Sequence, residues 1–420
     1  MIIRVLVLLG AALLTMGAVA VPKAASDPFR PPDRTVVQHD LGLLTAAAER
    51  PTGAAAAVRS LVPHLAAFED VAPDPARTAL WWAGLTAATR SVLLAAAPGV
   101  VGNLEGVPYS VRDVANRAVL AADLASARSR IGAGSGRGES QFLSERLRTL
   151  EQVRLALQRA PGGPARSLIA LDPTTGDRAA IAIGDVQTAD YVDFLVPGMY
   201  FTVADQMVDW TGTAASIQAQ QQQWLRHFHD SRSSAVVSWI GYRTPNVFTV
   251  ASFGLAQIGA ARLTDAVNGL NAARPASRPY TAVLAHSYGA TAALLALQNR
   301  AFSADALAMV GAPGSPAQSV HQLSVPAGDV FVGQAVWDGV ATSGFFGSDP
   351  AAPSYGATPL GTSGGVDPIT HLTLGPAVGH NGYFAPGSEA MRNLALVGIG
   401  RGGDVTAGTD RTSGTLALAR

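Results

Sequence analysis

A serine in the second half of the chain lies where a strand-like run meets a helix-like run. Thr281–Ala285 is apolar with small and β-branched side chains, and an Ala/Leu-rich stretch follows Ser287. The residues two positions to either side, Ala285 and Gly289, are both small. A sharp strand–turn–helix needs small residues there, because larger side chains would collide as the helix folds back on its strand. The segment predicts that Ser287 is a nucleophile presented on a tight turn.

A serine hydroxyl needs a base to take its proton and an acid to orient that base. When the nucleophile lies on such a turn, the acid and then the histidine follow it along the chain. Asp338 comes shortly after the apolar run 330–332, so we expect it to be the acid, with Asp349 as the alternative. His380 lies in a glycine-containing loop before the last predicted helix and is the expected base, with His371 as the lesser candidate. His286, beside the serine, is expected to point away from it in a structural role.

Acyl transfer by a serine also needs backbone N–H groups that stabilise the negative charge developing on the substrate oxygen. We expect one of them from Tyr288, directly after the nucleophile, and the other from the loop that follows the strand-like run 191–196. In that loop Gly198 allows close approach of the backbone, and Met199 is the predicted donor.

The elements that position these residues change character near residue 165. Up to about residue 157, apolar residues recur at helical spacing, which predicts helices over 41–68, 77–97, 111–131 and 139–158. Beyond it, helical stretches over 206–227, 253–271 and 388–399 alternate with strand-like runs, which predicts a mostly parallel, doubly wound sheet. The predicted strands are 167–171, 178–183, 191–196, 235–239, 281–285, 305–310, 329–332 and, weakly, 369–374. The first two form an antiparallel edge hairpin around a Pro173–Gly176 turn.

The N-terminus predicts export. Met1–Arg4 is a short basic start, residues 5–20 are apolar, and Ala18–Ala20 has the small-x-small pattern of a cleavage site. We therefore expect a secreted or cell-envelope protein, with an uncleaved membrane anchor as the alternative. The expected organisation is a signal peptide over 1–20, a linker over 21–34, a helical region over 35–165, an α/β-hydrolase domain over 166–401 and a disordered tail over 402–420.

Composition narrows the classes of function. Apolar residues make up 48% of the 420 residues and charged residues 14%, so a substantial core is expected. The net charge of zero argues against nucleic acid as a partner. The chain contains no cysteine, which excludes disulfides, thiolate zinc sites and cysteine nucleophiles. Phosphate-loop and zinc-protease motifs are also absent from the sequence, so we expect neither a metal nor an organic cofactor.

Several further segments are longer and more specific than the serine motif. They are Trp81–Leu85, Gly102–Pro108, Val111–Arg117, Val196–Met199, Trp239–Pro245, Ala285–Gly289 and Gly379–Ser388. Together they resemble an actinobacterial α/β-hydrolase family formerly of unknown function, in which a helical region precedes the hydrolase domain. The resemblance implies that fold, with Ser287 as nucleophile, His380 as base and the acid in the segment of Asp338. This chain departs from the family pattern at two places. The family more often has glycine where Ala285 stands, and it has a Gly-Asp-Pro-like acid segment where this chain has Trp337, Asp338 and Gly339.

These features favour an exported serine hydrolase of the esterase or lipase type, which cleaves a small-molecule or lipid ester through an acyl-enzyme. Trp81, Trp82 and the segment 103–116 could shape an acyl pocket or lid, or could simply pack helices together. Two alternatives remain open: a catalytically silent hydrolase fold that acts as an envelope binding or scaffold protein, and a peptidase or amidase that uses the same triad.

Overall fold

The structure, a computed structural model, describes residues 34–69, 72–134, 136–172 and 177–408. The predicted signal peptide, nearly all of the linker, the 173–176 turn and residues 409–420 lie outside these ranges. Among the described residues the chain forms two compact units. We call the part up to Thr281 the N-terminal unit and the part from Ala282 the C-terminal unit, and we describe each by itself.

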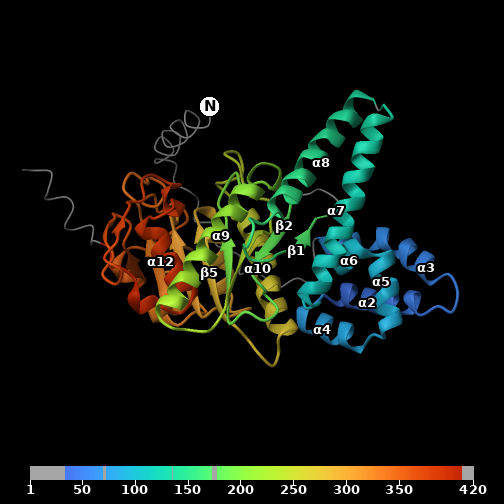
Figure 1. Cartoon of the computed structure of the whole chain (residues 1–420), viewed down its shortest axis with the longest axis horizontal. Coiled ribbons are helices and arrows are strands. Elements are labelled where there is room, and N and C mark those ends of the chain that lie inside the picture. Colours follow the sequence, from blue (N-terminus) through green and yellow to red (C-terminus); the bar gives the residue numbers. More distant parts are fainter. Residues whose placement is uncertain (1–33, 70–71, 135, 173–176, 409–420) are drawn as a thin grey trace, which may run out of the picture. The chain divides into compact units, whose positions relative to one another are not determined.

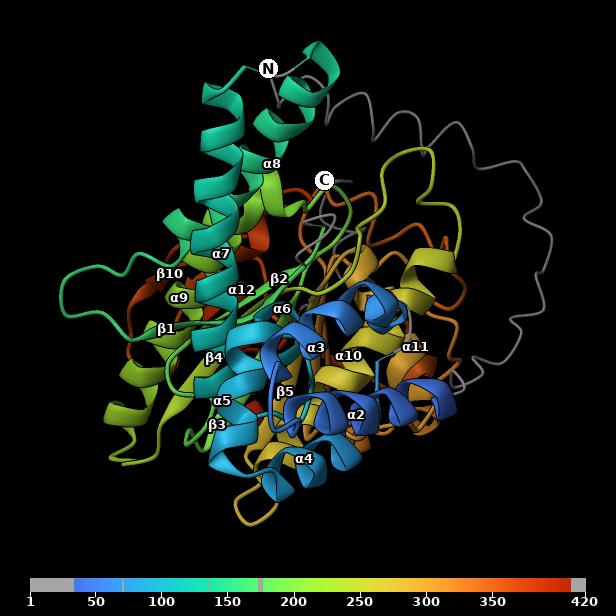
Figure 2. The same ribbon diagram turned by 90° about the vertical axis from the view of Figure 1, so that its right-hand side faces the viewer.

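The N-terminal unit begins with a group of short helices (Figure 2). Their buried apolar residues form one core cluster. The helices are α2 (Thr35–Ala48), α3 (Ala54–Leu61), η1 (Val62–Glu69), α4 (Pro75–Gly84), α5 (Ala87–Ala96) and α6 (Pro98–Val101). The two long helices predicted over 41–68 and 77–97 are each broken. The first break falls at Pro51 and Gly53, which adopts a left-handed φ of 68°. The second falls at Thr86, whose side chain accepts a hydrogen bond from Thr89 N and starts a new helix.

Trp81 and Trp82, which we considered as part of an acyl pocket, belong to the packing of these helices. Trp82 is buried in the apolar cluster, and Trp81 packs against it while its Nε1–H donates to Thr45 Oγ1 at 2.8 Å. Their role in the N-terminal unit is therefore to hold helices together.

Two longer helices, α7 (Tyr109–Gly132) and α8 (Arg137–Ala156), form an antiparallel hairpin (Figure 1). The remaining elements are β1 (Arg166–Leu171), β2 (Ala179–Ile183), β3 (Tyr191–Val196), α9 (Val203–His227), β4 (Ser234–Ile240) and α10 (Gly254–Ala273). The strands are ordered β1-β2-β4-β3. The pairs β1/β2 and β2/β4 are antiparallel, and β3/β4 is parallel. The predicted antiparallel edge hairpin is thus confirmed.

Side chains from α7 and from the segment before it bond the edge of β1 that pairs with no other strand in the described part of the chain. Asn103 binds both backbone groups of Leu171, donating to its oxygen at 2.8 Å and accepting from its N–H at 3.0 Å. Leu168 is bound in the same way, because its N–H donates to Asp113 Oδ1 at 2.6 Å and its oxygen accepts from Asn116 Nδ2 at 3.1 Å. An unpaired strand edge invites pairing with another chain. These side chains take the place of a neighbouring strand.

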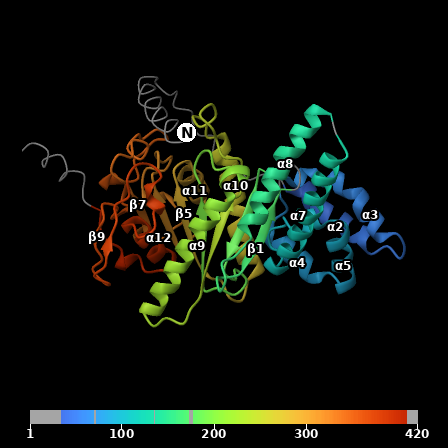
Figure 3. The ribbon, with the colours of Figure 1, turned by 45° about the horizontal axis from the view of Figure 1, so that its top comes forward.

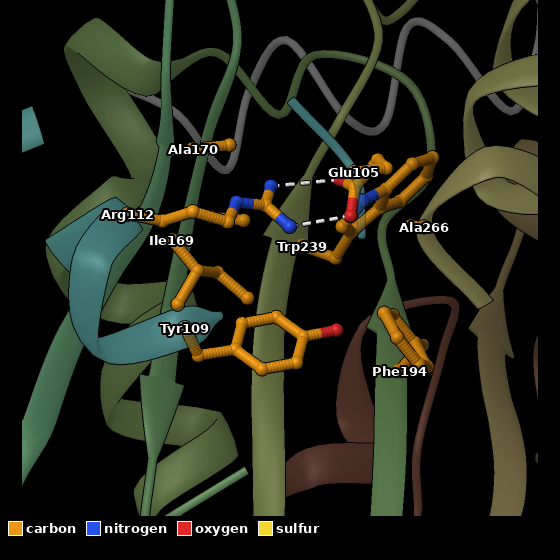
Figure 4. A pocket seen from close by; sticks show the side chains of 9 residues that line it. Glu105, Tyr109, Arg112, Ile169, Ala170, Phe194, Trp239 and Ala266 are labelled. Carbon is orange, nitrogen blue, oxygen red and sulfur yellow. Dashed lines mark hydrogen bonds and ion pairs between the residues drawn. The ribbon is translucent and has the colours of Figure 1, made fainter. Parts of the chain in front are cut away.

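A buried ion pair lies in the same segment (Figure 4). The Arg112 guanidinium is fully buried and makes two hydrogen bonds to Glu105, one of them 2.8 Å long from Nη2 to Oε1. Tyr109 and Trp239 line the small cavity beside it, whose volume of about 10 Å³ suits a single water molecule. Removing one partner of such a pair costs about 3–5 kcal/mol. Arg112 and Glu105 of the segment 103–116 therefore serve the packing of their own unit.

The C-terminal unit contains a second set of strands, ordered β5-β6-β7-β8 (Figure 3). The pairs β5/β6, β6/β7 and β7/β8 are all parallel. The main elements are β5 (Tyr280–His286, which starts at the boundary), α11 (Tyr288–Gln298), β6 (Ala306–Val310), β7 (Val330–Gly333), β8 (Thr358–Leu360) and α12 (Glu389–Gly398). Short 3-10 turns span Val320–Gln322 (η2), Ala327–Asp329 (η3), Pro353–Tyr355 (η4), Gly382–Phe384 (η5) and Gly402–Asp404 (η6).

The last part of the chain differs from the sequence prediction. The weak strand expected over 369–374 is reduced to β10 (Thr373–Leu374), which pairs antiparallel with β9 (Gly365–Val366) in a separate small hairpin. The final parallel strand is instead β8, whose central proline masks a strand pattern. Residues 402–408, expected to belong to a disordered tail, form η6 and a bridge between Leu360 and Ala407.

The fold class predicted from the sequence is confirmed: helices precede a mostly parallel α/β arrangement with an antiparallel hairpin at one edge. In the part of the chain that the structure describes, none of the helices combines the length and apolar character needed to cross a membrane.

A buried carboxyl in the N-terminal unit gives a test of the packing of β3 against α9. Asp193 of β3 is fully buried, and it accepts a hydrogen bond from Gln221 Nε2 of α9. Burial raises the pKa of Asp193 well above its ordinary value, and the Gln221 hydrogen bond only partly opposes this. Burial therefore favours the neutral form of Asp193 in the folded chain.

We predict that Asp193 makes the free energy of unfolding fall as the pH rises above about 4, where the unfolded chain ionises this carboxyl. The stability from the raised pKa is fully present below the unfolded pKa and is lost as the pH rises through the folded pKa. Asp193→Asn removes the ionisation, so its free energy of unfolding should decline less with pH than that of the wild type. Urea unfolding at a series of pH values measures the difference. Asp209→Asn, at an exposed position on α9, should behave like the wild type, and equal pH dependence in Asp193→Asn would contradict the prediction.

Candidate active site

Ser287 lies at the sharp turn between β5 and α11, as predicted. Its φ of 56° and ψ of −130° fall in a region that residues other than glycine rarely adopt. The turn is held by backbone hydrogen bonds from Ser287 N to Val310 O at 3.0 Å and from Ala290 N to Ser287 O at 2.9 Å. Such a conformation costs about 1–3 kcal/mol and persists only where its surroundings impose it. Here β5 and α11 are almost entirely buried, which provides that support.

Asp338 lies in the loop after β7, and its side chain is fully buried. Its Oδ1 accepts hydrogen bonds from the backbone N–H groups of Val340 at 3.0 Å and Ala341 at 3.1 Å. Asp349, the alternative acid, has other contacts: its Oδ1 accepts from Gln334 Nε2 at 3.1 Å and from Ala351 N at 2.9 Å. Asp349 therefore stabilises its own loop.

His380 connects the acid to the serine. Its Nδ1 lies 2.9 Å from Asp338 Oδ1, and its Nε2 lies 2.7 Å from Ser287 Oγ. The ring is 22% exposed, so that a substrate can reach it from solvent. His371, the lesser candidate, lies in the exposed turn between β9 and β10, where its backbone N–H donates to Asp367 O. The C-terminal unit thus brings together Ser287, His380 and Asp338 in one hydrogen-bonded chain.

The environment of Asp338 keeps its carboxylate charged. Burial is the largest single influence and raises its pKa, but hydrogen bonds from His380, Tyr383 and Ala341 N together outweigh burial and leave the pKa below its ordinary value. An ionised acid at this position holds the proton on His380 Nδ1 and stabilises the imidazolium that forms when Nε2 accepts a proton. The arrangement can therefore activate the Ser287 hydroxyl for attack on a carbonyl carbon.

Tyr383 is a member of the site that the sequence analysis did not single out. Its hydroxyl donates to Asp338 Oδ2 at 2.5 Å and accepts from Ala335 N at 2.9 Å. Burial and, after it, the charge of Asp338 raise the pKa of Tyr383, so the hydroxyl keeps its proton. Tyr383 comes three residues after His380 in η5. This short spacing was the available signal that one loop supplies both the base and a donor to the acid.

His286 also touches the site, although the sequence predicted only a structural role that points away from the serine. It is buried, and its Nε2 lies 2.8 Å from the backbone oxygen of His380. Burial lowers the pKa of His286 to about 3, so its ring is neutral and Nε2–H is the donor. The last residue of β5 therefore anchors the loop that carries His380.

Gly311, directly after β6, leaves room for the acid and the base. Its φ is 64°, and a Cβ there would lie 3.1 Å from Asp338 Oδ2 and 3.1 Å from two ring atoms of His380. Glycine is thus required both by the backbone conformation and by the side chains that approach it.

The two expected oxyanion donors lie in different units. Tyr288 is the first residue of α11, at the positive end of the helix dipole, and its ring packs edge-on against Phe346 at 5.5 Å. Met199 follows β3 in a loop that is tied to the β4–α10 loop by hydrogen bonds from Tyr200 N to Pro245 O and from Tyr242 Oη to Pro197 O, both 3.0 Å. The roles of Tyr288 and Met199 remain predictions.

Comparisons with known proteins agree with this architecture. Residues 172–347 match the family model described as alpha/beta hydrolase. Uncharacterized protein Rv0963c of Mycobacterium tuberculosis (strain ATCC 25618 / H37Rv) is 30% identical over 236 residues, which cover 54% of this chain and 86% of Rv0963c. The chain therefore belongs to the same family as Rv0963c, and its fold is the α/β-hydrolase fold.

A longer relative from the same strain, uncharacterized protein Rv2079, is 29% identical over 386 residues, which cover 77% of this chain. The chain spans 55% of the length of Rv2079. Among solved structures, a thermostable esterase from Pseudomonas putida aligns with 68% of this chain and 97% of its own, at 11% identity and a TM-score of 0.33.

The hydrogen bond from Tyr383 to the Asp338 carboxylate should contribute to the stability of the fold. Tyr383→Phe removes a donor to a buried carboxylate, and we expect it to lower the free energy of unfolding by about 1.5–3 kcal/mol. Tyr355→Phe is the matched control, because the Tyr355 hydroxyl is also buried but bonds the neutral Ser315 hydroxyl at 2.9 Å. This control should cost only about 0.5–1.5 kcal/mol. Urea unfolding of both variants at pH 7 measures the two losses in free energy of unfolding. Equal losses would argue against a charged carboxylate at Asp338.

Proposed function

We propose that the protein is a serine hydrolase that cleaves carboxylic esters through an acyl-enzyme. The observation that carries the proposal is His380, which bonds Ser287 Oγ at 2.7 Å on one side and Asp338 Oδ1 at 2.9 Å on the other. The match to the alpha/beta hydrolase family model supports hydrolase chemistry in general. Cleavage of esters in particular is our inference.

The reaction has two halves. Ser287 Oγ attacks the ester carbonyl carbon while its proton passes to His380 Nε2, and Asp338 stabilises the imidazolium. Collapse of the tetrahedral intermediate breaks the carbonyl–alkoxy bond, and His380 returns the proton to the departing alcohol. Water then loses a proton to His380, attacks the acyl-enzyme and releases the carboxylic acid and Ser287. We propose the N–H group of Tyr288 as a donor to the oxyanion.

The strain at Ser287 favours this function over a catalytically silent scaffold. A fold that only binds a partner has no physical need to hold a serine at a positive φ beside a buried, charged acid, at a cost of about 1–3 kcal/mol. The predicted signal peptide adds the proposal that the enzyme acts outside the cytoplasm. N-terminal sequencing of protein recovered from the envelope or medium of its host would test that second point.

The nucleophile is tested with a fluorophosphonate probe and p-nitrophenyl acetate. We expect the wild type to be labelled and to turn over the ester, and Ser287→Ala to lose labelling and at least about 1,000-fold of kcat/KM. Ser343→Ala, an exposed serine in the acid loop, is the control and should behave as the wild type. A folded wild type that is neither labelled nor active would contradict the proposal and favour the scaffold function. Faster turnover of matched amides than of esters would favour a peptidase or amidase.

The space at Gly311 gives a second test of the mechanism. Gly311→Ala places a methyl group against His380 and Asp338, so we expect the labelling rate of Ser287 to fall by about tenfold or more, since small displacements of reacting groups are costly. Gly356→Ala is the matched control: its φ of 86° is also left-handed, but its nearest neighbour is a Val320 methyl at 3.3 Å. Both variants should lose stability, while only Gly311→Ala should lose labelling beyond the folded fraction measured by circular dichroism. Equal labelling of the two folded variants would show that His380 and Asp338 tolerate the displacement.

A further inference from the structure

Three large apolar side chains are exposed next to the acid and the base. They are Val336 at 49% exposure, Trp337 at 86% and Val378 at 57%, and we call them the apolar strip. A parallel bridge joins Val336 to Val378, and Gly379 N donates to Val336 O at 2.8 Å. Asp338 follows Val336 by two residues, and His380 follows Val378 by two residues. The strip therefore borders the hydrogen-bonded chain proposed to carry out catalysis.

The conformation of Trp337 has no explanation in packing. Its φ is 64°, a left-handed value that costs an ordinary residue roughly 1–2 kcal/mol. A buried aromatic ring could offset that cost, but this ring is almost fully exposed and gains little from folding. The next residue, Asp338, has a fully buried side chain. The turn thus exposes the Trp337 indole to solvent directly before Asp338. A strained backbone conformation next to a candidate active site suggests that the side chain it exposes binds a ligand.

The chemistry of the surrounding segments restricts what the apolar strip can bind. Between residues 330 and 348 the only charged residue is Asp338. Between residues 373 and 388 the only ionisable side chains belong to His380 and Tyr383, and this segment contains no Lys or Arg. These segments therefore offer no cation to a carboxylate or phosphate and no free anion to an amine. An exposed indole flanked by two valines suits an uncharged, apolar chain.

We propose that the apolar strip binds the apolar chain of a neutral ester, and that Trp337 is its specificity-determining residue. This inference rests on the proposed ester hydrolysis at Ser287. The apolar chain can belong to the acyl or to the alcohol part of the ester, and the two require different substrate series to tell apart.

The test compares chain-length preference in the full-length protein. One series is p-nitrophenyl esters from acetate to decanoate, and the other is acetate esters of alcohols of increasing length, all below their aggregation limits. We expect Trp337→Ala to lower the ratio of kcat/KM for the longest to the shortest substrate by about tenfold in one series, mainly through KM. The acyl part binds the strip if the first series responds, and the alcohol part binds it if the second responds.

Three further variants make the result specific. Trp337→Phe should restore most of the preference, because a smaller aromatic ring keeps the contact. Val378→Ala should shift the ratio in the same direction, and it replaces Trp337→Ala if that variant does not fold. Leu372→Ala removes an apolar side chain in the turn between β9 and β10 whose exposure of 67% lies between those of Val378 and Trp337, and it should leave the ratio unchanged. A ratio unaffected by both Trp337→Ala and Val378→Ala would overturn the proposal.

Two outcomes separate this proposal from others. If the variants lose activity only on emulsified substrates above the aggregation limit, the strip contacts a lipid–water surface and the proposal is wrong. If the folded wild type is neither labelled by the fluorophosphonate probe nor active on p-nitrophenyl acetate, the proposed ester hydrolysis is wrong. Titration calorimetry of p-nitrophenyl decanoate with Ser287→Ala then tests binding to the apolar strip by itself. Binding that weakens about tenfold or more when Trp337→Ala is added would support the strip, and unchanged binding would overturn it.

Discussion

The buried carboxylate of Asp338 is the constraint on which the site depends. An ion taken out of water must be compensated by hydrogen-bond donors, and here they come from His380, Tyr383 and the backbone of Val340 and Ala341. Two of these donors belong to the loop before α12, so satisfying the carboxylate also fixes the position of the base. His286 holds that loop from the other side through the His380 carbonyl. The requirement to solvate one charge therefore organises the loops after β7 and β10 around Ser287.

The N-terminal unit shows a different use of polar side chains. Asn103, Asp113 and Asn116 bond the free edge of β1, and Arg112 pairs with Glu105 in the interior. Each of these side chains makes at least one hydrogen bond to a backbone group or to an opposite charge. The segments Gly102–Pro108 and Val111–Arg117, which carry part of the family resemblance, thus serve the structure of this unit. Similarity of sequence in such segments indicates a common fold and does not indicate a common substrate.

Among the described residues of the C-terminal unit, four that are not glycine have a positive φ: Ser287, Arg300, Trp337 and His371. Ser287 and Trp337 are the two that lie at or next to the site. At Ser287 the strain is supported by buried elements on both sides, and it presents a hydroxyl to His380. At Trp337 the neighbouring acid is held by its hydrogen bonds, and the strain presents an indole to solvent. Two strained positions thus place a hydroxyl beside His380 and an exposed indole beside Asp338.

The sequence by itself predicted most of the α/β elements and the main candidate residues of the site. Strand-like runs matched β3, β5 and β6 closely, and Ser287, Asp338 and His380 were identified from the order of a strand, a loop and a glycine-containing segment, because these signals are local in the chain. Only the tertiary structure showed that Asp338 and not Asp349 faces His380, that Tyr383 and His286 support the acid and the base, and that β8 with its proline is a strand. These features depend on contacts between residues far apart in the chain, and spacing along a sequence does not encode which distant groups must satisfy one another's charges and hydrogen bonds.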